Sequence, residues 1–395
     1  MVSPEPVVET RAAHVMYLDG VRAVAATFVV LHHFYLAAYP SFPRNSGPGA
    51  LVWLLYGHLA VALFIVVSGI SLTLGPARNG LRLNSRSLYI RRRAWRIIPA
   101  YWAAILVSVA VAVVVGGGLS GKSVLVHTLL LQDVVANRPI NGAFWSIAVE
   151  WQIYFVFPLV LLALRRTTPA VVVAAAVGVS IIGHVLGVSV PILAPLDHVN
   201  PQFFALFVIG AACVVATRPD LAAKAWPRWL TRFALPASVV TVLLVFTVLG
   251  TARYAANLFW IDLLAGPVLA LSFAALLSGG LPILRRELGR RTFALAGSFS
   301  YSVYLVHAPI LALLIHFVAA PFDWRGGALF TFLLVVGLPV IFAGSYAFHL
   351  TAERPFLTCR SFADLRCALH KATVLRLRPP RPAPPAAAQD EEARA

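Results

Sequence analysis

Residues 16–38 read MYLDGVRAVAATFVVLHHFYLAA, and this stretch decides the fold. It is apolar over the roughly 20 residues that a bilayer requires, yet it contains Arg22 and His33, with Asp19 placed one turn before Arg22 to pair with it. Ionisable residues inside a membrane helix are costly and usually face the protein interior or a cavity. Eleven residues at about 100° each bring Arg22 and His33 to one helix face, about 16 Å apart along the axis. The stretch therefore predicts a fixed cation and a titratable base that point into the protein.

The composition is that of a polytopic membrane protein. Of the 395 residues, 60% are hydrophobic and 12% are charged, and the mean hydropathy is +0.83, whereas soluble proteins carry about a quarter charged residues. We expect an all-α fold with about ten transmembrane helices. The predicted spans are residues 16–38, 51–75, 98–117, 144–164, 169–190, 201–217, 233–251, 257–279, 298–318 and 328–350. The apolar stretch 124–135 is too short to span and is predicted to be re-entrant or interfacial.

The basic residues are distributed unevenly between the two sides of these spans. Of the 32 lysines and arginines, 26 fall on the side of the termini, five fall on the other side, and Arg22 lies within a span. The positive-inside rule then predicts cytoplasmic termini in a cytoplasmic (inner) membrane. Topology and contact with the lipid bilayer account for most of the net charge of +17, so nucleic acid is not an expected partner. The expected organisation is a cytoplasmic N-terminal segment (1–15), a membrane domain (16–355) and a basic, Pro- and Ala-rich tail (356–395) that is largely disordered.

A carboxylate is predicted close to His33. Glu150 lies in FWSIAVEWQIYFVFPL (144–159), and residue counting places it at a depth similar to that of His33. A carboxylate beside an imidazole fixes the tautomer and stabilises the imidazolium, as a general base requires. Ser146, four residues earlier, lies on the same helix face. Two alternatives stay open: Glu150 only pairs with an internal cation, or His32, rotated by about 100° from His33, takes the place of the base.

Two further segments supply polar side chains to the predicted spans. In RRRAWRIIPAYW (91–102), Arg93 and Arg96 are three residues apart and project on neighbouring positions of one face. Two forked guanidinium groups suit a phosphate-bearing ligand, although such arginines also serve simply as positive-inside anchors. In SFSYSVYLVHAPI (298–310), Tyr301, Tyr304 and His307 share a broad face. The alternative for His307 is a hydrogen bond between helices.

The order of these motifs resembles that of the membrane-bound acyltransferase 3 family. The segments that carry the resemblance are LDGVRAVAATFVVLHHF, LFIVVSGI, RRRAWRIIPAYW, FWSIAVEWQIYFVFPL and SYSVYLVHAP, which together extend over about residues 16–355. Members of this family O-acylate sugars of surface polysaccharides, lipopolysaccharide, peptidoglycan and some macrolides. The chain departs from the usual pattern at Val66, Val67 and Ile70, where the family more often has Leu and Phe around Ser68–Gly69.

The family motifs map onto this sequence residue by residue. The basic residue followed by ten residues and a histidine falls on Arg22 and His33, which agrees with the choice of His33 over His32 made from helix geometry. The remaining motifs fall on Arg93 and Arg96 (Arg-x-x-Arg), on Ser146 and Glu150 (serine to glutamate), and on Tyr301, Tyr304 and His307 (the Tyr/His stretch).

The resemblance implies an O-acyltransferase without a metal or a permanently bound cofactor. An acyl group, by default acetyl, would pass from cytoplasmic acyl-CoA to a hydroxyl of a carbohydrate or glycosylated acceptor at the outer side. His33 and Glu150 would be catalytic, and Arg22, Arg93 and Arg96 would bind acyl-CoA, with support from Ser146, Tyr301, Tyr304 and His307. The competing hypotheses are a transporter of an anionic solute, in which the arginines form the binding path, and a scaffold or flippase for a lipid-linked glycan.

Overall fold

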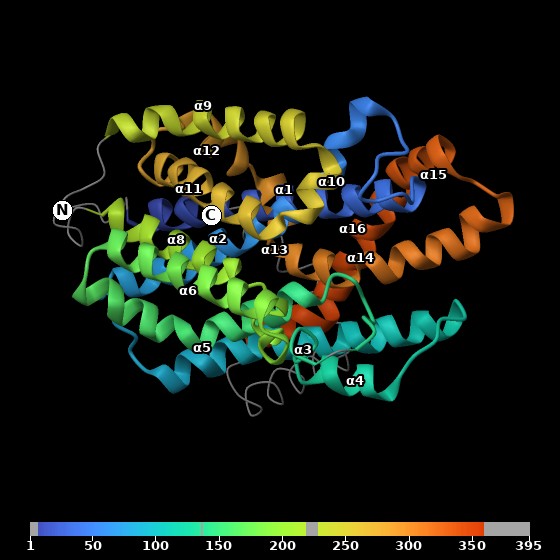
Figure 1. The fold of residues 1–395 in the computed structure, drawn as a ribbon, viewed down its shortest axis with the longest axis horizontal. Coiled ribbons are helices and arrows are strands. Elements are labelled where there is room, and N and C mark those ends of the chain that lie inside the picture. Colours follow the sequence, from blue (N-terminus) through green and yellow to red (C-terminus); the bar gives the residue numbers. More distant parts are fainter. Residues whose placement is uncertain (1–6, 136, 219–227, 359–395) are drawn as a thin grey trace, which may run out of the picture.

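The computed structural model describes residues 7–135, 137–218 and 228–358, and within these ranges it contains helices and no strand. Ten helical stretches are long and apolar enough to cross a membrane, and each overlaps one of the predicted spans, which confirms the polytopic all-α fold. They lie broadly along the long axis of the molecule (Figure 1). The stretches are Met16–Ala38, Gly49–Ala77, Arg86–Val114, Trp145–Arg166, Pro169–Ser189, Pro191–Ala216, Pro236–Ala256, Leu258–Leu277, Ser300–Phe322 and Gly326–Leu357.

Seventeen α-helical elements make up these stretches and their connections, joined in places by short 3-10 or π-helical turns. They are α1 (Val7–Ala38), α2 (His58–Ala77), α3 (Arg86–Val114), α4 (Gly121–Thr128), α5 (Trp145–Arg166), α6 (Pro169–Ser189), α7 (Pro195–His198), α8 (Gln202–Ala216), α9 (Arg228–Leu244), α10 (Gly250–Ala256), α11 (Leu258–Leu277), α12 (Pro282–Leu288), α13 (Arg291–Ser298), α14 (Ser300–Leu314), α15 (Gly326–Phe332), α16 (Leu338–Phe348) and α17 (Arg354–Thr358).

The surface of the bundle carries large apolar side chains, as a lipid-facing surface requires. Leu106 on α3, Leu159 on α5 and Leu264 on α11 are each more than 60% exposed. In water such side chains on neighbouring helices would form apolar patches of a size that soluble monomers avoid. In a bilayer they meet lipid tails that are as apolar as they are. The membrane assignment made from composition therefore agrees with the folded surface.

Helix α1 lies inside the bundle and connects its two ends. It packs against α2, α13 and α14 along its length, and the interior residues Tyr17, Val30 and Phe34 are fully buried. In Figure 1 it runs through the middle of the molecule. The polar side chains that α1 carries are therefore held in the protein interior, as the cost of exposing them to lipid predicts.

Two glycines allow α2 and α8 to approach each other closely. A Cβ added at Gly69 of α2 would collide with the backbone oxygen of Phe207 on α8, and one added at Gly210 of α8 would collide with the backbone oxygen of Val66 on α2. Small residues at such positions let helix backbones pack tightly in membranes. This reciprocal contact fixes the position of α2, which carries two serines of the site described below.

Two helices begin well before the positions predicted from the sequence. The third span was predicted to begin at residue 98, but α3 begins at Arg86, where the Ser85 hydroxyl accepts a hydrogen bond from the backbone N–H of Leu88 (3.2 Å). Arginine is a good helix former, so the helix continues beyond the apolar stretch. Helix α1 likewise begins at Val7, inside the predicted N-terminal segment. The stretch 124–135 forms the end of α4 and a series of turns, and the tail from residue 359 lies outside the described residues.

The two ends of the bundle differ in charge. Helix α2 ends, α3 begins and α5 ends at one of them, which we call the arginine-rich end because it carries Arg78, Arg82, Arg86, Arg165 and Arg166. At the opposite end α1 ends and α5 begins.

Candidate active site

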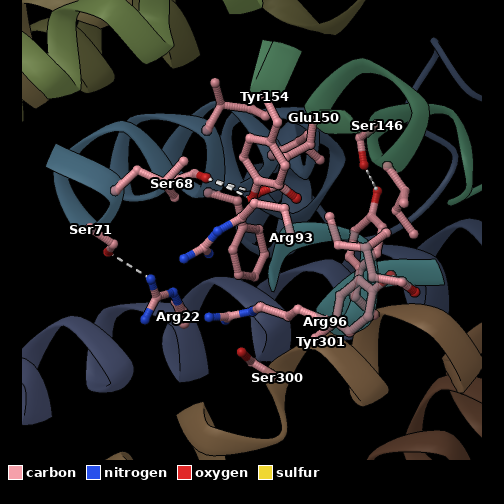
Figure 2. Close-up of a pocket in the computed structure, with 17 residues that line it drawn as sticks. Arg22, Ser68, Ser71, Arg93, Arg96, Ser146, Glu150, Tyr154, Ser300 and Tyr301 are labelled. Atoms are coloured by element: carbon pink, nitrogen blue, oxygen red, sulfur yellow. Dashed lines mark hydrogen bonds between the residues drawn. The ribbon is translucent and has the colours of Figure 1, made fainter. Parts of the chain in front are cut away.

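A cavity of about 160 Å³ lies between α1, α2, α3, α5 and α14. The site residues predicted from the sequence come from four of these helices, and seven of them line this one cavity (Figure 2): Arg22, Arg93, Arg96, Ser146, Glu150, Tyr301 and Tyr304. Segments that are far apart in the chain thus bring their polar residues together, as the sequence motifs predicted.

Arg22 is held on both sides of its guanidinium group. Nη1 donates to Asp19 on the same helix at 2.7 Å, and Nη2 donates to the Ser71 hydroxyl of α2 at 2.7 Å. The sequence analysis predicted that Arg22 pairs with Asp19, one turn earlier on the same helix, and the structure contains this salt bridge. The side chain of Arg22 is 17% exposed, so its cation is fixed in the wall of the cavity and remains within reach of a ligand.

Arg93 and Arg96 add charge that the described residues do not neutralise. The guanidinium of Arg93 lies 6.0 Å from the ring centroid of Tyr89 and 5.9 Å from that of Tyr154, in cation–π contact with both. Neither arginine forms a salt bridge with a carboxylate of the described chain. Figure 2 shows the guanidinium groups of Arg22, Arg93 and Arg96 converging on the same space. With three arginines and one carboxylate in its wall, the cavity attracts anions.

Glu150 binds hydroxyl groups and does not contact His33, contrary to the sequence-based expectation. Its carboxylate accepts hydrogen bonds from Ser68 (2.7 Å) and from Tyr154. Among the described residues it forms no hydrogen bond or salt bridge with His33, nor a salt bridge with an arginine, so the alternative of an internal ion pair also fails. Residue counting gave the depth of Glu150 but not the direction in which α5 turns it, which is towards α2.

The tautomer of His33 is fixed by its own helix instead. Nδ1 lies 2.8 Å from the backbone oxygen of Val29, one turn earlier. A carbonyl oxygen can only accept, so Nδ1 carries the hydrogen and Nε2 presents a lone pair. The same arrangement occurs at His307, whose Nδ1 lies 3.1 Å from the oxygen of Val303 and 2.9 Å from that of Tyr304. Both imidazoles therefore present an Nε2 lone pair.

The two imidazoles face each other next to the cavity. Their ring centroids are 4.8 Å apart in an edge-to-face arrangement. His307 is fully buried, and its Nε2 has no hydrogen-bond partner in the described structure. An Nε2 lone pair without a partner can accept a hydrogen bond from a hydroxyl group or take up a proton. Neither His33 nor His307 lines the arginine cavity itself.

Tyr304 connects the imidazole pair to the cavity. Its ring centroid lies 6.0 Å from that of His307, and its hydroxyl is 2.7 Å from the hydroxyl of Ser146. When one of these hydroxyls donates to the other, the hydrogen of the acceptor remains available. Ser146 and Tyr304 thus provide one free O–H donor between the arginines and the imidazoles.

His32 hydrogen-bonds to a neighbouring element, whereas the hydrogen bond of His33 stays within its own helix. Its Nδ1 donates to the backbone oxygen of Leu54 at 2.6 Å, in the 3-10 segment Gly49–Tyr56 that precedes α2. Its ring is 5.2 Å from that of His33. The hydrogen bond of His32 therefore joins α1 to the segment that precedes α2.

Several residues of the site were not identified from the sequence. Ser68, Ser71 and Tyr154 line the cavity and hold Glu150 or Arg22 in place. The available signal was position: Ser68 lies within the motif LFIVVSGI, and Tyr154 is four residues after Glu150, on the same helix face.

A buried acid lies in the loop between α4 and α5, at the opposite end of the bundle. Asp133 is 9% exposed, and one of its carboxylate oxygens has no partner in the described structure. Burial raises the pKa of Asp133 to about 7. The same loop is tied to α14, because the side chain of Asn141 donates to the backbone oxygen of Leu305 at 3.1 Å. The loop therefore closes the bundle on the side of Tyr304 and His307.

Comparison with known protein families assigns most of the chain to a family. A family model described as an acyltransferase domain, of the acyltransferase 3 type, matches residues 15–350. No curated protein and no solved structure matches the chain.

Proposed function

The chain belongs to the acyltransferase 3 family and is a membrane acyltransferase, and we propose that it transfers an acyl group from cytoplasmic acyl-CoA to a hydroxyl of a carbohydrate or glycosylated acceptor. Acetyl is the expected acyl group. In this proposal both termini are cytoplasmic, the arginine-rich end faces the cytoplasm, and the acceptor arrives from the outer side of the inner membrane. The observation that carries the proposal is the pair of imidazoles beside a cavity lined by three arginines, with Nε2 atoms that have no hydrogen-bond partner among the described residues.

The arginines supply the site for the donor. The phosphates of acyl-CoA would bind near Arg93 and Arg96. Neither arginine forms a salt bridge with a carboxylate of the described chain. Forked guanidinium groups match phosphate oxygens in geometry. Arg22, held by Asp19 and Ser71, would add a third fixed cation. The pantetheine arm of the donor would then extend along α1 towards His33, over an offset of about 16 Å.

His33 would act as the general base. Its Nε2 would take the proton of the acceptor hydroxyl while the oxygen attacks the thioester carbonyl carbon. The C–S bond then breaks, and the thiolate of CoA leaves and receives the proton from the imidazolium, so that an ester and a free thiol result. The Nε2 of His307 has no hydrogen-bond partner in the described structure. It would accept a hydrogen bond from the acceptor hydroxyl, or from the protonated His33 ring after the proton has moved. The free O–H of the Ser146–Tyr304 pair would stabilise the negative oxygen that forms in the transition state.

Glu150 would position groups rather than orient the base. It holds the hydroxyls of Ser68 and Tyr154, and Tyr154 in turn lies in contact with the Arg93 guanidinium. The single negative charge in the cavity wall would also limit the repulsion among three arginines before the donor binds.

Release of free thiol from acetyl-CoA tests the proposal. Purified protein in detergent is mixed with acetyl-CoA and a panel of hydroxyl acceptors, and wild type is compared with His33→Ala. We expect acceptor-dependent release in the wild type that His33→Ala abolishes. CoA binding without thiol release from any acceptor would contradict the proposal and favour transport of an anion, which uptake into vesicles without thioester cleavage would then establish.

A further inference from the structure

Two larger cavities adjoin the catalytic cavity at the arginine-rich end. The first, which we call the loop cavity, has about 500 Å³ between the 79–85 loop and the start of α3, and it shares Ser71, Leu72 and Arg93 with the catalytic cavity. The second, the α13 cavity, has about 490 Å³ beside the end of α13 and shares Arg22, Ser71, Arg96, Ser300 and Tyr301 with it. A donor molecule could therefore reach the catalytic cavity by either route, and the two routes differ in their side chains.

The charges of the two cavities decide between them. The described residues of the loop cavity include Arg82, Arg92 and Arg93 and no acid, a net charge of +3. Those of the α13 cavity include Arg22, Arg78 and Arg96 but also Asp19 and Glu353, so three positive and two negative charges leave a net charge of +1. Glu353 is 3% exposed and is held by hydrogen bonds from Ser302 (2.6 Å) and His349 (2.8 Å). A ligand with several phosphates is attracted far more strongly to the loop cavity.

The polar groups of the loop cavity also suit a nucleotide. The amide of Asn79 donates to the side-chain oxygen of Asn84 at 3.0 Å, so the NH₂ of Asn84 and the oxygen of Asn79 remain available as a donor and an acceptor. A purine presents the same combination of groups along its edge. The first turn of α3, capped by Ser85, adds the partial positive charge of a long helix at the same place.

Arg93 connects the loop cavity to the site of chemistry. It lines both cavities, and its guanidinium is held between the rings of Tyr89 and Tyr154. A phosphate bound to Arg93 from the side of the loop cavity lies at the boundary of the catalytic cavity. The rest of a linear donor can continue from there towards Glu150 and Tyr304.

We propose that the loop cavity binds the anionic nucleotide end of the acyl donor, through Arg82 and Arg92 and the amides of Asn79 and Asn84. This assignment rests on the proposed function, because it takes the donor to be acyl-CoA. The α13 cavity is then not the donor route.

The test compares exposed arginines from the two cavities. Arg82→Ala and Arg92→Ala remove charge from the loop cavity, and Arg78→Ala, which removes one from the α13 cavity, is the matched control. Equilibrium binding of CoA to the purified protein is the first readout. We expect each loop-cavity variant to weaken binding on the order of fivefold, Arg82→Lys to recover most of the loss, and Arg78→Ala to bind as the wild type does. Equal losses in all three variants, or a loss in Arg78→Ala alone, would overturn the assignment.

A donor without the nucleotide separates this assignment from the proposed function. S-acetyl-pantetheine carries the same thioester but no phosphates. We expect the loop-cavity variants to raise the KM for acetyl-CoA and leave the KM for S-acetyl-pantetheine unchanged. Turnover of both donors with no difference between the variants would leave the acyltransfer proposal intact and refute the loop cavity. Failure of the wild type to bind CoA at all would refute both.

Discussion

Replacement of His33 by alanine should abolish acyl transfer without unfolding the protein. The hydrogen bond of the His33 ring goes to the backbone oxygen of Val29, within its own helix, so the change removes no hydrogen bond between helices. The ring packs edge-to-face against His307 and His32, and loss of such contacts costs about 1 kcal/mol each. Normal amounts of protein should therefore reach the membrane.

The expected kinetic effect is much larger than the structural one. A positioned general base contributes about 10²–10⁴ in rate, which corresponds to about 3–5 kcal/mol of the activation barrier. Because the rings of His33 and His307 are in contact and the proposed mechanism places one proton between them, the effects of their replacement should not add. His307→Ala in a His33→Ala background should lower the rate by far less than it does in the wild type.

The assay is acceptor-dependent thiol release from acetyl-CoA, normalised to the amount of purified protein. His32→Ala is the matched control. The His32 ring neighbours the His33 ring, but its Nδ1 donates to the backbone oxygen of Leu54, in the segment that precedes α2. It should lose about 1 kcal/mol of stability and keep a rate near that of the wild type. A His33→Ala rate within tenfold of the wild type, or an equal loss in His32→Ala, would refute the assignment of the base.

Three further variants test the packing, the carboxylate and the buried loop acid. Gly69→Ala should lower the apparent melting temperature in detergent through an overpacking cost of about 1–3 kcal/mol, whereas Gly75→Ala, whose Cβ meets open space, should not. Glu150→Gln should keep kcat within about tenfold of the wild type, because Glu150 does not contact the base. A loss of kcat as large as that of His33→Ala would contradict the positioning role of Glu150. Burial raises the pKa of Asp133 to about 7, so the native state holds an extra proton between about pH 4 and 7, and stability falls as the pH rises through that window, by an upper limit on the order of 4 kcal/mol. Asp133→Asn should remove this slope in melting temperature, and parallel pH curves for variant and wild type would contradict it.

The sequence predicted the spans well because their signal is local. An apolar run of sufficient length has few alternatives to a membrane helix, and all ten runs were found as helices. The start of α3 was missed because the arginines from Arg86 onward continue the helix outside the apolar region. Hydropathy indicates which part of a helix crosses the apolar core of the membrane. Helix propensity and the N-cap at Ser85 decide where the helix begins.

The relative positions of candidate site residues could be predicted from the sequence within one helix, but not between two helices whose orientation had to be known. The spacing of Arg93 and Arg96 brought both to one cavity, because the period of a helix is fixed. The pairing of Glu150 with His33 required the rotation of α5 relative to α1, and counting residues gives only depth. Packing between helices decides that rotation, and in the structure Glu150 accepts a hydrogen bond from Ser68 of α2.

Helix α1 explains why the two halves of the site stay in register. Arg22 lies in the wall of the anion-attracting cavity, and His33 lies beside the second imidazole. Both belong to one continuous helix, so their separation of about 16 Å and their common face are set by helix geometry alone. The other site helices can shift by small amounts without changing that distance. Because His33 takes its tautomer from Val29 on the same helix, the cation, the base and the orientation of the base all depend on α1, and the packing of α1 inside the bundle positions them together.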